Sequence, residues 1–377
     1  MEIFENVQFN ILFLIKKIYK IYIFVKNFYI AQKILLKNRI NQLKNKINQI
    51  KNKIKNKKNC LFAILNLDNS NINDFVLNFT TRIYNEMLDI NYSTFYPNLV
   101  KNLDEKSVEC VDNIISKIKV VAEDNIFENK RIFTFRELLQ IKKVRLDFFF
   151  NLKRINENCC KYKNYLLPIN HFEASVFYYK HNIESLNKDN FKNKDIIDVG
   201  AFICDSAIVF SPYTTGNIYS FEPTTKNYDL IQKTLTLNPE FRNIKPVKKA
   251  LGSKNETQLI HVLDSCSSIN NVFLNMEHNL ETIEITTLDD FVSENNLNNI
   301  GLIKVDVEGF EQEFLKGAIN TIKSQKPTLL LSIYHSADDF FNIKSIIENL
   351  NLNYKFKIVK PVDGSVCLET LLICEQA

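Results

Sequence analysis

Residues 195–206 read DIIDVGAFICDS, and the strand predicted at 195–199 ends in Asp198-Val199, followed by Gly200-Ala201. This strand and those after it are nearly continuous apolar runs, which is typical of strands buried on both faces. The glycine lets the backbone pass close to a ligand, because no Cβ intrudes. Ligands of open α/β sheets bind beyond the carboxyl ends of the strands. We therefore expect Gly200 to border a binding crevice, where Asp198 could meet a cationic group such as an amino-acid ammonium.

The pattern around this run alternates between strand-like and helical segments from about residue 193 onward. We expect strands at 195–199, 217–221, 244–248, 258–263, 283–286, 302–305, 328–333, 354–359 and 366–373, and helices at 225–237, 288–294, 310–324 and 338–350. This alternation predicts an α/β domain with a mostly parallel, doubly wound sheet. The turn Val362-Asp363-Gly364 predicts a terminal antiparallel hairpin.

An acidic residue closes the second predicted strand, in Phe221-Glu222-Pro223, 24 residues after Asp198. An acid at roughly this distance past the glycine turn is placed to accept the hydrogens of both ribose hydroxyls. The pattern indicates a nucleoside cofactor. It does not separate a nicotinamide cofactor from S-adenosylmethionine.

Two further strand ends carry side chains suited to catalysis. Asp306 and Glu308 follow strand 302–305, where carboxylates face the ligand crevice. The alternative is that Glu308, like Glu311, complements the positive end of the next helix. His335 follows strand 328–333, and its intrinsic pKa near neutrality suits proton removal from a hydroxyl. A core or surface histidine is the alternative for His335. Nothing in the pattern requires a metal, although a metal site formed by Asp306, Glu308 and His335 is an alternative.

Six segments of the sequence resemble the FkbM methyltransferase family. They are IIDVGAFICDSA, IYSFEP, KKALGS, ITTLDDF, IGLIKVDVEGFEQEFLKGA and KPTLLLSIYH, in the expected order between residues 193 and 377. The resemblance implies a class I methyltransferase (Rossmann-like) fold with a seven-stranded sheet. It also implies O-methyl transfer from S-adenosylmethionine, commonly to sugars, glycans or other hydroxylated metabolites.

The resemblance also implies roles for single residues. The methionine end of the cofactor would lie along Asp198, Gly200, Ala201 and Phe202. Glu222 would hold the ribose, Lys249 and Ala250 would border the adenine, and Asp306 would approach the methyl donor or the acceptor. Catalysis would then fall to Asp306, His335 and Glu308.

Two positions depart from the family pattern. Phe202 stands where the family usually has asparagine, and Cys204 where it usually has glycine. Losing the glycine at position 204 narrows the space for backbone near a cofactor. The two departures leave an alternative open: the protein is a non-catalytic scaffold, or a membrane-tethered protein, whose cofactor site has decayed. A nicotinamide-dependent oxidoreductase on the same sheet is a second alternative, although the later glycines of G-x-G-x-x-G are missing.

Charge is divided unevenly along the 377 residues, whose net charge is +5. Residues 1–58 hold 14 Lys/Arg and 2 Asp/Glu, whereas the remainder holds 34 and 41. The acidic remainder disfavours a nucleic-acid partner, because phosphate backbones are bound through clustered Lys and Arg.

We expect three regions: a basic helical arm at 1–58, a mainly helical accessory region at 59–190, and the methyltransferase domain at 191–377. Near the end of the second region, His171, Glu173 and His181 suit either a packing connector or a wall over the cofactor cleft.

The arm carries a heptad-like series of apolar residues, spaced by four and three: Leu36, Ile40, Leu43, Ile47, Ile50 and Ile54. The spacing predicts a short coiled coil, with disorder as the alternative. Residues 9–30 mix aromatic and aliphatic residues with lysines, so they suit either self-association or contact with an anionic membrane surface. We expect a cytoplasmic protein, peripheral at the inner face of the membrane if that contact forms.

Overall fold

The computed structural model describes residue 37 and residues 41–49, 51–52, 55, 57–262 and 279–376. The chain forms two compact units, residues 1–65 and residues 66–377. The division falls near the predicted end of the basic arm, but the predicted second and third regions belong to one unit. No helix in the described part of the chain has both the length and the apolar character to span a bilayer.

The first unit is helical at residues 41–49 and 57–65. Leu43 and Ile47, two positions of the predicted seam, are 60% and 50% exposed. The other four seam positions and residues 9–30 lie outside the described residues. The coiled coil and the membrane contact therefore stay predictions.

The second unit begins with helices, as expected. They are η1 (Leu67–Asn69), α2 (Asp74–Leu88), α3 (Tyr92–Val100), α4 (Glu105–Ala122), α5 (Asn129–Ile132) and α6 (Phe135–Asn151). The three longest start at side chains that accept a hydrogen bond from a backbone amide of the first turn, namely Asn73, Asp104 and Thr134. Such caps satisfy donors that a helix leaves without an internal partner.

A small antiparallel sheet follows, where the sequence predicted mainly helix. It consists of β1 (Leu152–Asn156), β2 (Cys159–Tyr162) and β3 (Tyr165–Leu167). Lys163, in the turn between β2 and β3, has a left-handed backbone with φ 51°. The fully buried Tyr162 ring stacks on Phe148 of α6 at 4.5 Å between centroids. Strands this short escape a search for periodicity, because two or three alternations do not exceed chance.

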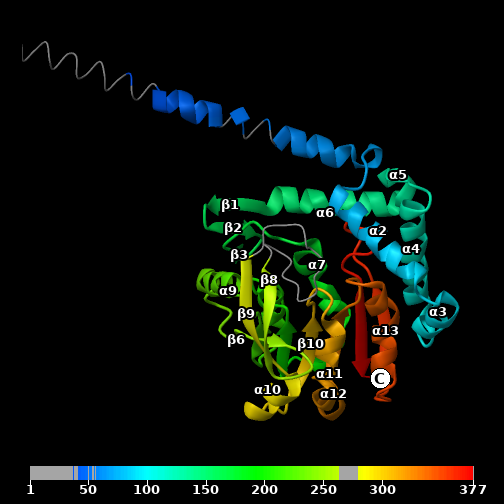
Figure 1. Ribbon diagram of the computed structural model, residues 1–377. Helices are drawn as coiled ribbons and strands as arrows, with labels where there is room; N and C mark the ends of the chain where they lie inside the picture. Colours follow the sequence, from blue (N-terminus) through cyan, green and yellow to red (C-terminus); the bar gives the residue numbers. More distant parts are fainter. Residues whose placement is uncertain are drawn as a thin grey trace, which may run out of the picture. The chain divides into compact units, whose positions relative to one another are not determined.

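The rest of the chain alternates strands and helices (Figure 1). The elements are α7 (Ala174–Phe177), η2 (Lys180–Ser185), η3 (Lys188–Asn190), β4 (Asp195–Val199), α8 (Asp205–Phe210), η4 (Ser211–Tyr213), β5 (Ile218–Phe221), α9 (Thr225–Leu237), β6 (Ile244–Val247), β7 (Ala250–Leu251), β8 (Glu256–Val262), β9 (Asn279–Thr286), α10 (Leu288–Glu294), β10 (Ile300–Val305), α11 (Glu311–Lys316), α12 (Ile319–Gln325), β11 (Thr328–Ser332), α13 (Ala337–Glu348), β12 (Tyr354–Val359) and β13 (Leu371–Gln376).

Seven strands form the central sheet in the order β12-β13-β11-β10-β4-β5-β6. Within this sheet, β13 runs antiparallel to both of its neighbours, β11 and β12, and all other neighbouring strands are parallel. The predicted fold class, a mostly parallel seven-stranded sheet with a terminal antiparallel hairpin, is confirmed. A second, three-stranded sheet has the order β7-β9-β8.

Successive residues of the central strands point to opposite faces of the sheet and enter separate cores. Ile197 and Leu329 pack in one core with residues of α2, α4 and α13, whereas Ile196 and Leu330 pack in the other with residues of α7, α8 and α9. Burial on both faces explains why the strands are continuous apolar runs.

Two expected elements differ. The helix expected at 310–324 is two helices, α11 and α12, and Gly317 ends the first of them. A Cβ at Gly317 would lie 1.9 Å from the Gly252 carbonyl oxygen. The strand expected at 366–373 begins only at Leu371, and residues 360–370 connect β12 to β13. This connection supplies one wall of the site.

Candidate active site

A cavity of about 550 Å³ opens at the carboxyl ends of β4, β5 and β10. Its floor includes Gly200, Glu222, Lys304 and Asp306. Further walls come from α2, from residues 171–176 and from the 360–370 connection. The volume is within the range of about 300–1,000 Å³ that is usual for ligand pockets. The cavity thus lies where the sheet topology predicts a ligand.

Gly200 allows the ends of two strands to approach each other closely at the cavity floor. Its φ is 75°, and a Cβ built there would lie 1.8 Å from the Asp306 carbonyl oxygen. The Asp306 amide also donates to the Val199 carbonyl at 3.1 Å. Only glycine fits this contact between the ends of β4 and β10, because any side chain would collide with backbone.

Lys304 is a site residue that the sequence did not single out. Its buried ammonium donates to the Gly200 carbonyl at 3.0 Å and lies 3.4 Å from Asp198 Oδ1. Burial works to lower the pKa of Lys304, but Asp198, Asp306 and Asp205 together raise it. Asp198 does meet a cation, but that cation is Lys304. Asp198 is fully buried and is not on the cavity wall.

Glu222 points into the cavity at the end of β5. Its Oε1 accepts hydrogen bonds from the Thr224 amide at 2.9 Å and hydroxyl at 2.6 Å. Its Oε2 accepts from the Phe202 amide at 3.2 Å. These bonds fix the carboxylate, while burial raises its pKa to about 7. Thr224 precedes α9, but its side chain makes no cap bond and orients Glu222 instead.

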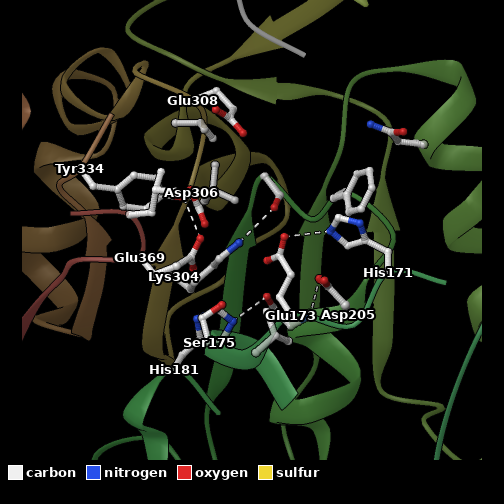
Figure 2. A pocket seen from close by; sticks show the side chains of 18 of the residues that line it. His171, Glu173, Ser175, His181, Asp205, Lys304, Asp306, Glu308, Tyr334 and Glu369 are labelled. Atoms are coloured by element: carbon white, nitrogen blue, oxygen red, sulfur yellow. Dashed lines mark hydrogen bonds and ion pairs between the residues drawn. The ribbon is translucent and has the colours of Figure 1, made fainter. Parts of the chain in front are cut away.

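On the opposite side, Asp306 lines the cavity beside Tyr334, whose hydroxyl donates to Asp306 Oδ1 at 3.3 Å. His335 Nε2 lies 3.4 Å from the same oxygen, and His335 Nδ1 lies 2.8 Å from Glu311. Glu308 completes the group, 3.6 Å from His335 Nε2, with a left-handed φ of 55°. Figure 2 shows Asp306, Glu308 and Tyr334 on one side of Lys304.

Residues 198–357 match the family model described as methyltransferase FkbM domain. The chain contains an FkbM methyltransferase domain. Domains of this family are typical of methyltransferases, and the family implies S-adenosylmethionine as the methyl donor. The match does not specify an acceptor, and no curated protein matches the chain.

Among solved structures, the methyltransferase FkbM from Methylobacillus flagellatus is 17% identical, with a TM-score of 0.41 over 72% of this chain and 60% of that one. This chain thus spans less than two thirds of that protein. A Streptococcus mutans protein in complex with SAH is 8% identical, with a TM-score of 0.35 over 55% of this chain and 100% of that one. A methyltransferase from Geobacter sulfurreducens is 7% identical, with a TM-score of 0.35 over 54% and 80%. These similarities are too distant to bear on the substrate.

The two departures from the family pattern leave the cavity of the FkbM domain open. Phe202 and Cys204 both have left-handed backbones, with φ of 48° and 63°. The Phe202 ring turns toward the His171 ring, with 4.8 Å between centroids, and forms part of the cavity wall. Cys204 is fully buried and keeps the conformation that glycine adopts more readily. Neither residue fills the hollow between Glu222 and Asp306.

The remaining predicted residues of the FkbM domain divide into two groups. Ala250 and Glu308 line the cavity, as do Gly200, Phe202, Glu222 and Asp306. Asp198, Ala201, Lys249 and His335 do not line it. The Lys249 ammonium instead lies 3.5 Å from Glu284.

Residues 171–176, for which the sequence left two interpretations open, form a wall of the cavity. His171 Nε2 lies 2.9 Å from Glu173 Oε1. His181 also lines the cavity, where burial lowers its pKa to about 3 and its Nε2 lies 2.9 Å from the Ser206 hydroxyl. The wall interpretation is therefore the one that the structure supports.

His335 does not suit the role of general base that the sequence suggested. Burial works to lower its pKa, but Glu311, Glu308 and Asp306 outweigh burial and raise that pKa to about 10. The imidazole is thus protonated near neutrality and already holds the proton that a base would have to accept. Its role in the FkbM domain is that of a buried cation behind Asp306.

The positive charge of the buried His335 imidazolium predicts that the folded protein loses stability at alkaline pH. The folded-state pKa exceeds the usual value, so His335 contributes stability fully below about pH 6.5 and loses it as the pH rises through about 10. We expect the urea midpoint of the wild type to fall between pH 7 and pH 10, and that of His335→Gln to fall less steeply. Circular dichroism at each pH measures both. Parallel curves would contradict a protonated His335.

Proposed function

We propose that the FkbM domain transfers a methyl group from S-adenosylmethionine to a hydroxyl of a sugar, a glycan or a similar metabolite. The observation that carries the proposal is one continuous cavity with an oriented Glu222 carboxylate at one end and Asp306 at the other. Gly200 lies between them and leaves open the space that a side chain would occupy. The residues present thus fit a nucleoside cofactor placed next to a reacting hydroxyl.

The cofactor would lie with its adenosine on the β5 side. The Glu222 carboxylate would accept hydrogen bonds from the ribose hydroxyls. Beside it, the cavity is lined by apolar side chains suited to an adenine ring: Ala250, Leu251, Ile260, Ile283 and Phe310. When bound, S-adenosylmethionine supplies a methyl group that its sulfonium already activates.

At the other end, Asp306 would take the proton of the acceptor hydroxyl. The Tyr334 hydroxyl and the His335 imidazolium contact the same oxygen of Asp306 and hold the carboxylate in place. Asp363 and Glu369 also line the cavity and can accept hydrogen bonds from further hydroxyls. Many acceptor oxygens around one cavity suit a polyhydroxylated substrate.

Binding of S-adenosylhomocysteine tests the cofactor site. Because the pKa of Glu222 is about 7, we expect the affinity to rise about tenfold between pH 6 and pH 8, as the carboxylate ionises and accepts the ribose hydrogens. Glu222→Gln should weaken binding at pH 8 by about 10- to 100-fold, the range for a hydrogen bond to a charged group. Isothermal titration across this pH range measures both effects.

Asp205 lines the same cavity and also has a pKa of about 7, so its ionisation could produce the same pH dependence. The Glu222→Gln variant distinguishes the two carboxylates. If Glu222 causes the pH dependence, Glu222→Gln removes it. Equal pH profiles in both proteins would exclude this role. Binding of NAD without binding of S-adenosylhomocysteine would favour an oxidoreductase, and binding of neither would favour a scaffold.

Transfer of labelled methyl groups tests the acceptor. The purified full-length protein is incubated with methyl-labelled S-adenosylmethionine and with monosaccharides, nucleotide sugars, oligosaccharides, peptides or phospholipids. We expect label on a hydroxylated carbohydrate, in an ether that resists mild base. Label only on a peptide or a lipid would refute the proposed acceptor class and leave the cofactor assignment intact.

A further inference from the structure

Three potential metal ligands meet on the cavity wall opposite Asp306. His171 and Glu173 come from the segment before α7, and Asp205 is the first residue of α8. One ligand atom from each lies within 4.8 Å of the other two. All three residues line the cavity, and Figure 2 shows them together on the far side of Lys304 from Asp306.

Asp205 is a buried carboxylate with few partners. It is 6% exposed, and its Oδ1 accepts one hydrogen bond, from the next amide, Ser206 N, at 2.7 Å. No residue in the described ranges donates to its second oxygen. Burial, and then the nearby Glu173 carboxylate, raise the pKa of Asp205 to about 7. Burying a carboxylate with so little compensation is costly unless a cation joins it.

We propose that His171, Glu173 and Asp205 bind a divalent transition-metal ion of the Zn²⁺ or Mn²⁺ class. An imidazole with two carboxylates is a donor set that suits these ions. Donor atoms about 2.0–2.2 Å from one metal ion lie roughly 3 Å from each other, and His171 Nε2 and Glu173 Oε1 are 2.9 Å apart. The open side of the site faces the cavity, which leaves room for water or an oxygen of a substrate.

A second cluster in the described residues, Asp306 with Glu311 and His335, has the same donor types. It suits a metal less well, because His335 is buried and does not line the cavity. A metal ion needs an entry path to its ligands. The His171 cluster provides the path, because all three of its residues line the cavity.

The ion would join two chain segments. His171 and Glu173 belong to the wall, whereas Asp205 follows the loop that carries Gly200 and Phe202. The inference does not depend on methyl transfer, because the three ligands belong to the fold of this chain whatever the acceptor is. Binding should raise the thermal unfolding temperature, since the ion binds the folded chain and not the separated segments.

The test uses the metal-stripped full-length protein and titrates it with Zn²⁺ and with Mn²⁺ by calorimetry, with Mn²⁺ also followed by electron paramagnetic resonance. We expect one ion per chain and at least tenfold weaker binding in both Asp205→Asn and His171→Gln. Asp205→Asn is nearly isosteric and removes a poorly compensated charge, so it should fold. Unfolding of the metal-free variants checks this.

Two control variants distinguish binding at the His171 cluster from binding at a surface carboxylate or at the second cluster. Asp189→Asn removes a surface carboxylate whose side chain is 76% exposed, and it should bind the ion like the wild type. His335→Gln disrupts only the second cluster and should also bind normally. Absence of binding, wild-type affinity in Asp205→Asn, or a loss confined to His335→Gln would each overturn the proposal. Binding of S-adenosylhomocysteine to the metal-free protein is measured separately, so that failure of the cofactor site is distinguishable.

Discussion

Replacing Gly200 with alanine is expected to abolish measurable binding of S-adenosylhomocysteine and to lower the free energy of unfolding by at least about 2 kcal/mol. The left-handed backbone alone costs a side chain about 1–2 kcal/mol. The added Cβ would also lie 1.8 Å from the Asp306 carbonyl oxygen, so the ends of β4 and β10 must separate. That movement displaces Lys304 and Asp306 together. Urea unfolding and isothermal titration measure the two effects.

Gly364→Ala is the matched control for the stability part. Gly364 has a φ of 98°, but its Cβ would meet the guanidinium end of Arg145 at 3.0 Å and no backbone atom. A flexible side chain can move away, so we expect only the backbone cost of about 1–2 kcal/mol. If the two alanine variants lose the same stability and Gly200→Ala still binds S-adenosylhomocysteine, the contact between the strand ends does not shape the site.

The central strands of the catalytic domain could be predicted because they are buried on both faces. Strands such as 300–305 and 328–332 are buried along their whole length and are therefore mostly apolar. The short strands β1 to β3 could not be predicted in this way. Their stability comes from contacts with α6, such as the Phe148–Tyr162 stack, which no local pattern reveals.

The site was predictable where one strand end determines it, as for Gly200, Glu222 and Asp306. Contacts within the site could not be predicted where they depend on the register between two neighbouring strands. The parallel register places Lys304 directly opposite Asp198, and this pairing converts an expected ligand contact into a buried ion pair. Only a register pairing reveals it, since the two residues are far apart in the sequence.

His335 illustrates the same limit for a pKa. Its place at the end of β11 was apparent from the sequence, and its partner Glu311 was known as a helix-end acid. The sequence could not show that α11 turns Glu311 inward, where it is fully buried and 2.8 Å from His335 Nδ1. A histidine expected to accept a proton therefore keeps one.

With His335 protonated, proton transfer from the acceptor falls to Asp306, and Asp306→Asn should lower kcat by at least about 100-fold. Removal of a positioned general base typically costs 10²–10⁴-fold. The amide has the shape of the carboxylate and can still accept from Tyr334, so the affinity for S-adenosylhomocysteine should change by less than about threefold. The measurement is single-turnover methyl transfer to the carbohydrate that accepts most label.

Glu308→Gln serves as the comparison for Asp306→Asn, since both remove one carboxylate from the surroundings of His335 at 3.4–3.6 Å. If Asp306 accepts the proton, only its replacement reduces kcat strongly, and kcat of Glu308→Gln stays within about tenfold of the wild type. If both variants lose turnover equally, the carboxylates act by their summed charge on His335. If Asp306→Asn retains full turnover, the proton leaves by another route and the assignment of Asp306 is wrong.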